Sequence, residues 1–187
     1  MALFTKAIFK SISTSRAGNK GIAKVLNEAK FETRSSKTTS LFLSHSHTDK
    51  DIVQEAVSFF KGFNHSIYID WMDDTMPENT SGITAANIKN KIIENDMFIL
   101  LATNKAVESK WCNWELGIAD VFKFAKDKMV ILPLADNSTG WVGNEYLQVY
   151  PRVELVNKDK TAFHDNIFYI IYPDGSRKWL DEWLKII

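Results

Sequence analysis

Glu115 is the residue whose type and position most strongly suggest chemistry. It ends the segment Ser-Lys-Trp-Cys-Asn-Trp-Glu at positions 109–115, which opens a helix predicted to run to about residue 126. At about 100° per residue, Trp111, Ile118 and Phe122 share one face of that helix, and Glu115 lies about 20° from Phe122. A carboxylate within an apolar stripe is costly to desolvate unless something binds it. Such a placement is typical of binding and catalytic sites.

Glu115 and two residues of its segment each have a structural alternative. Glu115 can instead end in an ion pair at the rim of the stripe, with Lys89 or Lys91 as its partner. Trp111 lies one turn earlier, where its indole can stack on an aromatic ligand or simply fill the core. Cys112 either borders the same pocket or is a small buried residue.

The elements that must position this segment alternate between strands and helices. Short runs that are apolar throughout are predicted to be strands, at residues 41–43, 67–69, 97–102 and 129–135. Helical spacing marks the stretches between them, which indicates a parallel sheet covered on both faces. The fold class is therefore α/β, a flavodoxin-like doubly wound sheet of about five strands. Residues 153–156 and 167–172 are further strand candidates, and a closing helix carries Trp179, Leu180, Trp183, Leu184 and Ile187.

In such sheets, ligands bind outside the carboxyl ends of the strands. The segments that leave these ends are residues 44–49, 70–82, 103–109 and 136–148. The site is expected among them, with Glu115 supplied by the helix that follows the third of these segments.

Residues 1–37 differ in character from the rest of the chain. They hold eight basic and two acidic residues, with apolar residues spaced along the first part at Leu3, Phe4, Ile8, Phe9 and Ile12. The pattern predicts a basic, helical N-terminal extension that packs on the domain or on a partner copy. A mitochondrial transit peptide and a mobile tail are the alternatives. Residues 38–187 then form the main domain.

Composition limits the classes of function. The 187 residues carry a formal net charge of zero, so no global field favours nucleic acid or an anionic membrane. No apolar run reaches the roughly 18 residues of a membrane span. The single cysteine, Cys112, fits a reducing compartment, and the expected location is cytoplasmic.

Several other classes of site lack their required residues. A phospho-receiver needs an acidic pair after the first strand, where this chain has Ser44, His45 and Ser46. His45 and His47 have spacing suited to a metal, but no third ligand is suggested nearby. A P-loop and the G-x-S-x-G elbow of serine hydrolases are absent from the sequence.

The chain from about residue 40 to its end resembles TIR (Toll/interleukin-1 receptor) domains, in the form found in bacterial single-domain proteins. Leu-Phe-Leu-Ser-His-Ser-His-Thr-Asp-Lys-Asp, at residues 41–51, resembles the opening strand and first helix of the family. Ile-Tyr-Ile-Asp at residues 67–70, with the loop to residue 82, resembles its second strand and BB loop. Residues 97–102 followed by Ser-Lys-Trp-Cys-Asn-Trp-Glu resemble its "S-x-W-C-x-x-E" segment.

This resemblance implies a role for each candidate residue. In the enzymatic members, the glutamate of this segment is required to cleave NAD between nicotinamide and ribose, which assigns the catalytic role to Glu115. The loop at residues 71–82 would be a mobile lid that also makes contacts between TIR domains. The residues placed around the substrate are Trp111, Ser44, His45, Asp70, Trp71 and Cys112, with no metal.

The resemblance also implies the substrate, products and partners. NAD is the substrate rather than a cofactor, and the products are nicotinamide with ADP-ribose, a cyclic isomer or an ADP-ribosyl conjugate. Similar stand-alone bacterial proteins act in antiphage defence of the Thoeris kind, where the product signals to a separate effector protein. The alternative is a non-catalytic scaffold that works through TIR–TIR contacts, as an adaptor or a mimic of host signalling. An adaptor has no reason to keep a desolvated carboxylate at position 115, which favours the enzyme.

Overall fold

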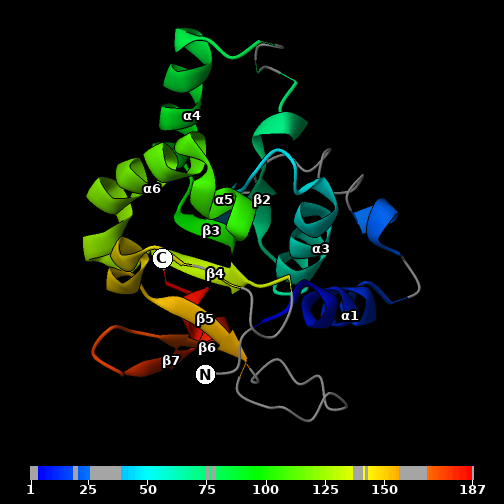
Figure 1. The fold of residues 1–187 in the computed structure, drawn as a ribbon. Coiled ribbons are helices and arrows are strands. Elements are labelled where there is room, and N and C mark those ends of the chain that lie inside the picture. The colour runs from blue at the N-terminus through cyan, green and yellow to red at the C-terminus, as the bar shows by residue number, and fades with distance from the viewer. Residues whose placement is uncertain are drawn as a thin grey trace.

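A single mixed sheet forms the centre of the computed structural model (Figure 1). The structure describes residues 4–18, 21–25, 39–74, 76, 79–136, 141, 143–155 and 168–186. Within these ranges the sheet has seven strands in the order β2-β1-β3-β4-β5-β6-β7. The strands are β1 (Ser40–Ser44), β2 (Ser66–Tyr68), β3 (Met97–Thr103), β4 (Met129–Leu134), β5 (Arg152–Leu155), β6 (Phe168–Ile171) and β7 (Arg177–Trp179).

The first five strands are parallel, and β6 and β7 continue the sheet in antiparallel fashion. The predicted doubly wound α/β sheet is confirmed, with an antiparallel hairpin added at one edge. That hairpin corrects the predicted closing helix. Trp179 lies in β7, where its ring stacks on Tyr169 of β6 at 3.9 Å, and helix α7 spans only Leu180–Trp183. Cross-strand aromatic stacking explains why the strand extends through Trp179.

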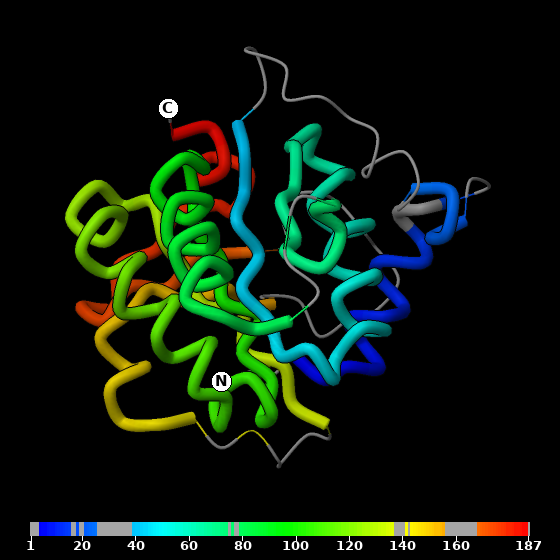
Figure 2. Tube along the Cα trace, turned by 90° about the horizontal axis from the view of Figure 1, so that it is seen from above, coloured from blue at the N-terminus to red at the C-terminus, as the bar shows by residue number. Residues whose placement is uncertain are grey.

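Helices cover both faces of the sheet (Figure 2). Helices α1, α3 and α7 pack on one face, and α4, α5 and α6 pack on the other. The strands between them are buried throughout in β1, β3 and β4, as expected for a sheet covered on both sides. The helical elements are α1 (Lys6–Ala17), α3 (Lys50–Lys61), η2 (Asp70–Met72), α4 (Gly82–Glu94), α5 (Asn104–Glu108), α6 (Lys110–Lys123), η3 (Phe124–Lys126) and η4 (Glu145–Val149).

Helices α6 and α3 differ in how their N-terminal ends are capped. Ser109 caps α6 as predicted, because its hydroxyl accepts the backbone N–H of Cys112 at 3.3 Å. Helix α3 has no such cap, although Thr48 and Asp51 have the spacing of a capping box. Helix α3 begins at Lys50, its N-cap Asp49 makes no side-chain cap, and the Asp49 carboxylate accepts the hydroxyl of Thr103 instead.

The N-terminal segment is part of the core. Phe4, Phe9 and Ile12 are buried in the same cluster as α3 and β6. The backbone of residues 4–6 pairs in parallel with Ala135, just after β4, through N–H to O distances of 2.8 Å on both sides. The predicted helix in the N-terminal segment is therefore confirmed, and it spans Lys6–Ala17. Residues 26–38, which include the predicted boundary at residue 37, lie outside the described residues.

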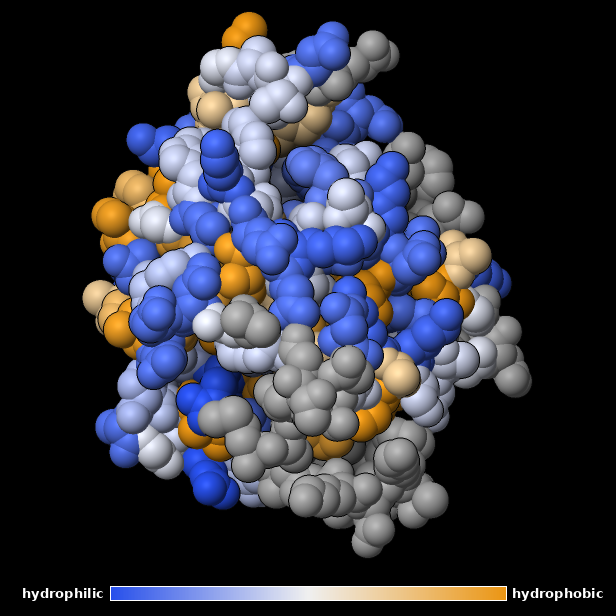
Figure 3. Space-filling view, in the orientation of Figure 1, coloured by the Kyte–Doolittle hydropathy of each residue, from blue (hydrophilic) through white to orange (hydrophobic). Residues whose placement is uncertain are grey.

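The described helices are too short or too polar for any of them to cross a membrane. The face of the molecule seen in Figure 1 is largely hydrophilic, with apolar residues gathered in separate small groups (Figure 3).

Candidate active site

Helix α6 buries Glu115, but on a different face from the one the sequence predicts. Its buried side chains are Cys112, Glu115, Leu116, Ala119 and Lys123. The predicted stripe was centred on Trp111, Ile118 and Phe122, and Phe122 is 37% exposed. The buried face is therefore rotated by about a quarter of a turn from the prediction. Small residues at positions 112 and 119 let the helix lie close to the sheet, and the large rings flank it.

Glu115 lies over the end of β1. Its Oε2 accepts the hydroxyl of Ser44, the last residue of that strand, at 2.6 Å. Burial raises the pKa of Glu115 to about 8; the Ser44 hydrogen bond opposes this rise, and the nearby negative charge of Asp70 adds to it. Burial therefore favours the protonated, uncharged form of Glu115 in the absence of ligand.

Lys91 is not the ion-pair partner of Glu115, and the thiol of Cys112 is not charged. The ion pair considered for Glu115 does not form with Lys91, whose Nζ lies 3.6 Å from Glu94 and over the ring of Tyr68. Cys112 is buried, and burial raises the pKa of its thiol to about 12. The thiol is therefore uncharged at neutral pH and is not a nucleophile there.

Asp70 follows β2 and lies beside two histidines. Its Oδ1 accepts the backbone N–H of Trp71 at 2.8 Å and lies 3.5 Å from Nε2 of His45. Nε2 of His47 lies 3.9 Å from the other carboxylate oxygen. The ring of His45 is fixed from behind, because its Nδ1 donates to the carbonyl of Leu43 at 2.9 Å. Within the described ranges, no set of three or more His, Cys, Asp or Glu side chains is placed to hold a metal ion.

A cavity of about 310 Å³ opens in front of Asp70. Three predicted site residues line it: Asp70, Trp71 and Trp111. The remaining four, Ser44, His45, Cys112 and Glu115, are buried and are not among its lining residues. The sequence indicated His47 only as a metal ligand, and it placed Asp73, Met76 and Thr80 within the loop at residues 71–82 without singling them out. It did not single out the remaining lining residues, Thr84 and Ile88. Ile88 carries a helical core pattern, so periodicity alone gives no sign of its second role.

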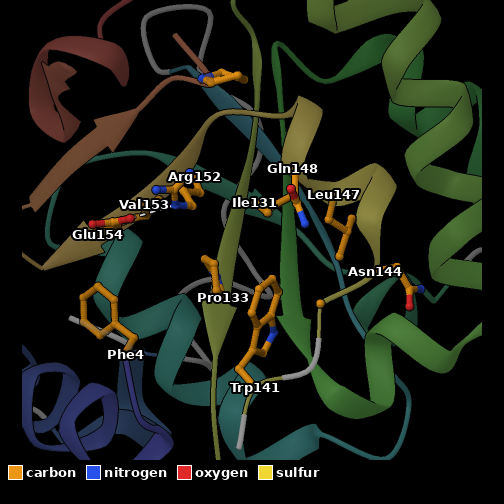
Figure 4. Close-up of a pocket in the computed structure, with 12 residues that line it drawn as sticks. Phe4, Ile131, Pro133, Trp141, Asn144, Leu147, Gln148, Arg152, Val153 and Glu154 are labelled. Carbon is orange, nitrogen blue, oxygen red and sulfur yellow. Dashed lines mark hydrogen bonds and ion pairs between the residues drawn. The ribbon is translucent and has the colours of Figure 1, made fainter. Parts of the chain in front are cut away.

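The segment 136–148, which was expected near the site, lies beside a different cavity. This cavity of about 430 Å³ is lined by residues of β4, β5 and η4 and by Phe4 (Figure 4). Trp141 lies against Pro133 there, and its indole N–H donates to the carbonyl of Ala102 at 2.5 Å. Residues 137–140 and 142 of this segment lie outside the described residues. The two cavities share no lining residue.

The fold and this arrangement of residues define a class of protein. Residues 41–167 match the family described as the TIR domain, which is more than half of the chain. The protein therefore belongs to the TIR domain family.

Two relatives narrow the comparison. The chain is 29% identical over 164 residues to a Bacillus cereus (strain MSX-D12) protein named "Probable 3' cyclic ADP-D-ribose synthase ThsB'", a match that covers 82% of this chain and 83% of the relative. It is 29% identical over 83 residues to TIR2 of Cytobacillus dafuensis, a candidate cyclic ADP-D-ribose synthase. That match covers 43% of this chain and 22% of the relative. The chain is thus a TIR-domain protein whose distant relatives are named as cyclic ADP-ribose synthases.

Proposed function

We propose that this protein cleaves NAD between nicotinamide and ribose, with Glu115 as its essential carboxylate, and closes the remainder into a cyclic ADP-ribose isomer. The observation that carries the proposal is a buried carboxylate, at the carboxyl edge of a parallel sheet, next to a cavity with two indole rings. The names of both relatives support the cyclic product.

The chemistry suits a buried glutamate. Nicotinamide leaves NAD as a neutral ring, so the reaction needs little help from a general acid. The ribosyl group becomes oxocarbenium-like in the transition state, as in glycoside hydrolysis. A carboxylate with little access to water stabilises that positive charge strongly. NAD itself carries a positive nicotinamide ring, which favours the charged form of Glu115 when it binds nearby. Substrate binding is therefore expected to release the proton that the empty site holds.

The cavity indicates how the substrate is received. Its volume of about 310 Å³ is at the lower end of the range of ligand pockets, so it accommodates part of a dinucleotide. Trp71 and Trp111 offer aromatic faces for nicotinamide or adenine, and Asp70 can accept hydrogen bonds from ribose hydroxyls. Glu115 is buried and is not among the lining residues, so the substrate reaches it only if side chains that line the cavity shift. Pro77 of the loop at residues 71–82 lies outside the described residues.

The wider context follows from the same proposal. The cyclic product would serve as a signal in antiphage defence of the Thoeris kind, read by a separate effector protein in the cytoplasm. Contacts between copies through the loop at residues 71–82 would support assembly, and Trp71 in that loop is 38% exposed.

A single assay tests the proposal. Purified protein at high concentration is incubated with NAD, and products are resolved by chromatography and mass. Glu115→Gln keeps the shape and the Ser44 contact but removes the charge. Glu55→Gln is the matched control, because Glu55 is equally buried on the opposite face of the sheet, in α3. Nicotinamide should appear with the wild type and Glu55→Gln, and be lost with Glu115→Gln. If none of the three consumes NAD, the scaffold function replaces the enzyme.

A further inference from the structure

His45 has a ring nitrogen that the fold leaves without a partner. Because the carbonyl of Leu43 can only accept, Nδ1 of His45 must carry a proton to make its 2.9 Å hydrogen bond. In the neutral ring, Nε2 is then a bare acceptor. It is buried and has no hydrogen-bond partner among the described residues, and its nearest charged neighbour is Asp70 Oδ1 at 3.5 Å. A buried acceptor that faces a carboxylate oxygen is unfavourable unless a proton comes between them.

Asp70 connects this nitrogen to the cavity. Asp70 is one of the residues that line the cavity, and its Oδ1 lies beside Nε2 of His45. One proton delivered to the pair would form a charge-assisted hydrogen bond between imidazolium and carboxylate. Burial lowers the pKa of His45 and Asp70 opposes that change, so the ring is neutral and able to accept a proton. The other groups that act on the ring are His47, which is largely exposed, and the buried Asp49.

The proposed reaction needs such an acceptor. When NAD closes into a cyclic ADP-ribose, nicotinamide leaves with the electron pair of its bond to ribose. A hydroxyl oxygen then forms the new bond to the same carbon and must lose its proton. Glu115 is committed to stabilising the positive charge at that carbon, so a second group has to take the proton.

We propose that Asp70 and His45 form the proton-accepting pair for the attacking hydroxyl. Asp70 takes the proton from the hydroxyl and passes it to Nε2 of His45, which leaves an imidazolium beside a carboxylate. The balance is one NAD cation giving a neutral nicotinamide, the cyclic product and one proton, which the pair later returns to solvent. This inference rests on the proposed function and assigns its second catalytic group.

The test compares two nucleophiles in the same protein. The natural hydroxyl or water must lose a proton, whereas 3-acetylpyridine attacks the ribosyl carbon through a ring nitrogen that has none to lose. Asp70→Asn keeps the contact with the Trp71 N–H, and His45→Gln keeps a polar side chain. We expect kcat at saturating NAD for cyclisation and hydrolysis to fall about 100-fold in both variants. Exchange of nicotinamide for 3-acetylpyridine, also measured at saturating NAD, should fall far less, because it needs no proton acceptor; any lost ribose contact in Asp70→Asn then appears in KM for NAD.

A variant of a histidine remote from the cavity serves as the control. His65→Gln changes another buried histidine with an unpaired nitrogen, at the start of β2 and therefore at the opposite edge of the sheet, and should leave both reactions unchanged. If both reactions fall together in Asp70→Asn and His45→Gln, these residues act in binding or folding, and the proposal is wrong. It is also wrong if neither reaction falls. Absence of nicotinamide release by the wild type would instead overturn the proposed function itself.

Discussion

The two faces of the sheet are packed with different kinds of side chain, although they share the same strands. On the face covered by α1, α3 and α7, aromatic rings interlock: Phe59 contacts Phe9 at 5.3 Å and Phe168 at 5.0 Å between ring centres. On the face covered by α4, α5 and α6, the cluster contains Cys112 and encloses the carboxylate of Glu115. Each face also buries a carboxylate, Glu55 on the first and Glu115 on the second. Of the two, Glu115 lies at the carboxyl end of β1, where it accepts the hydroxyl of Ser44, so the faces differ in where the buried carboxylate is placed rather than in whether there is one.

The largest expected effect concerns the aromatic face. Phe59→Ala should lower the free energy of unfolding by about 3–5 kcal/mol, because it opens a cavity among rings that cannot collapse into it. Phe122→Ala on α6 is the control, since Phe122 is 37% exposed and should change stability by only about 0.5 kcal/mol. Denaturant unfolding measures both. Similar losses in the two variants would contradict the contrast between the faces.

On the face that contains Glu115, replacing the buried side chain should raise the stability of the protein instead of lowering it. The pKa of Glu115 is raised to about 8 in the folded protein, above its ordinary value of 4.5. Its favourable contribution is therefore complete below pH 4.5 and is lost as pH rises toward 8, by up to about 1.4 kcal/mol per pH unit. Glu115→Gln removes this loss, so the variant should be more stable than the wild type at pH 8, on the order of 4 kcal/mol.

Thermal unfolding between pH 5 and pH 9 checks this second prediction. Glu108→Gln alters an exposed glutamate of α5 and should follow the wild type throughout. A Glu115→Gln variant that is less stable than the wild type at pH 8 would show that Glu115 is structural.

The smallest effect concerns the hydroxyl that contacts Glu115. Ser44 lowers the pKa of Glu115, so Ser44→Ala should raise it further, by about one unit for a lost charge-assisted hydrogen bond. The rise of kcat/KM for NAD with pH should then shift by about one unit toward alkaline pH, with an approximately tenfold lower value at pH 7. Ser58→Ala changes a buried serine of the opposite face and should leave the profile in place. An unshifted profile in Ser44→Ala would show that the Ser44 hydroxyl does not influence the pKa of Glu115.

Much of the fold could be predicted from the sequence, because its strongest signals are local. The apolar runs that became β3 and β4 are buried all along, and Ser109 caps α6 as its type suggests. The last strand, β7, could not be predicted, because the stacking of Trp179 on Tyr169 joins residues ten positions apart through a turn. The bond between Asp49 at the start of α3 and Thr103 could not be predicted either, because the two residues lie 54 positions apart.

The sequence indicated which strand ends meet at one edge of the sheet, but it did not give the geometry of the cavity there. The carboxyl-edge rule brings Ser44 and Asp70 to one edge, and the contact of Ser44 with Glu115 follows from that arrangement. The prediction of the buried face of α6 was wrong. It placed the large rings toward the core, whereas the small residues that let the helix approach the sheet lie there. The lining of the cavity by Thr84 and Ile88 depends on how α4 packs, which periodicity does not specify.

The pairing of the N-terminal segment with Ala135 and the stacking of Phe4 on Phe168 at 5.8 Å fix the order in which the protein can be completed. Helix α1 meets α3 through Phe9 and Phe59, which are closer together in the sequence, whereas Phe4 has to wait for β6. At about 5–20 residues per second, roughly ten seconds or more separate the synthesis of Phe4 from that of Phe168. A chain cut short before β6 therefore leaves Phe4 without its stacking partner, so the surroundings of Phe4 report whether that strand has been made.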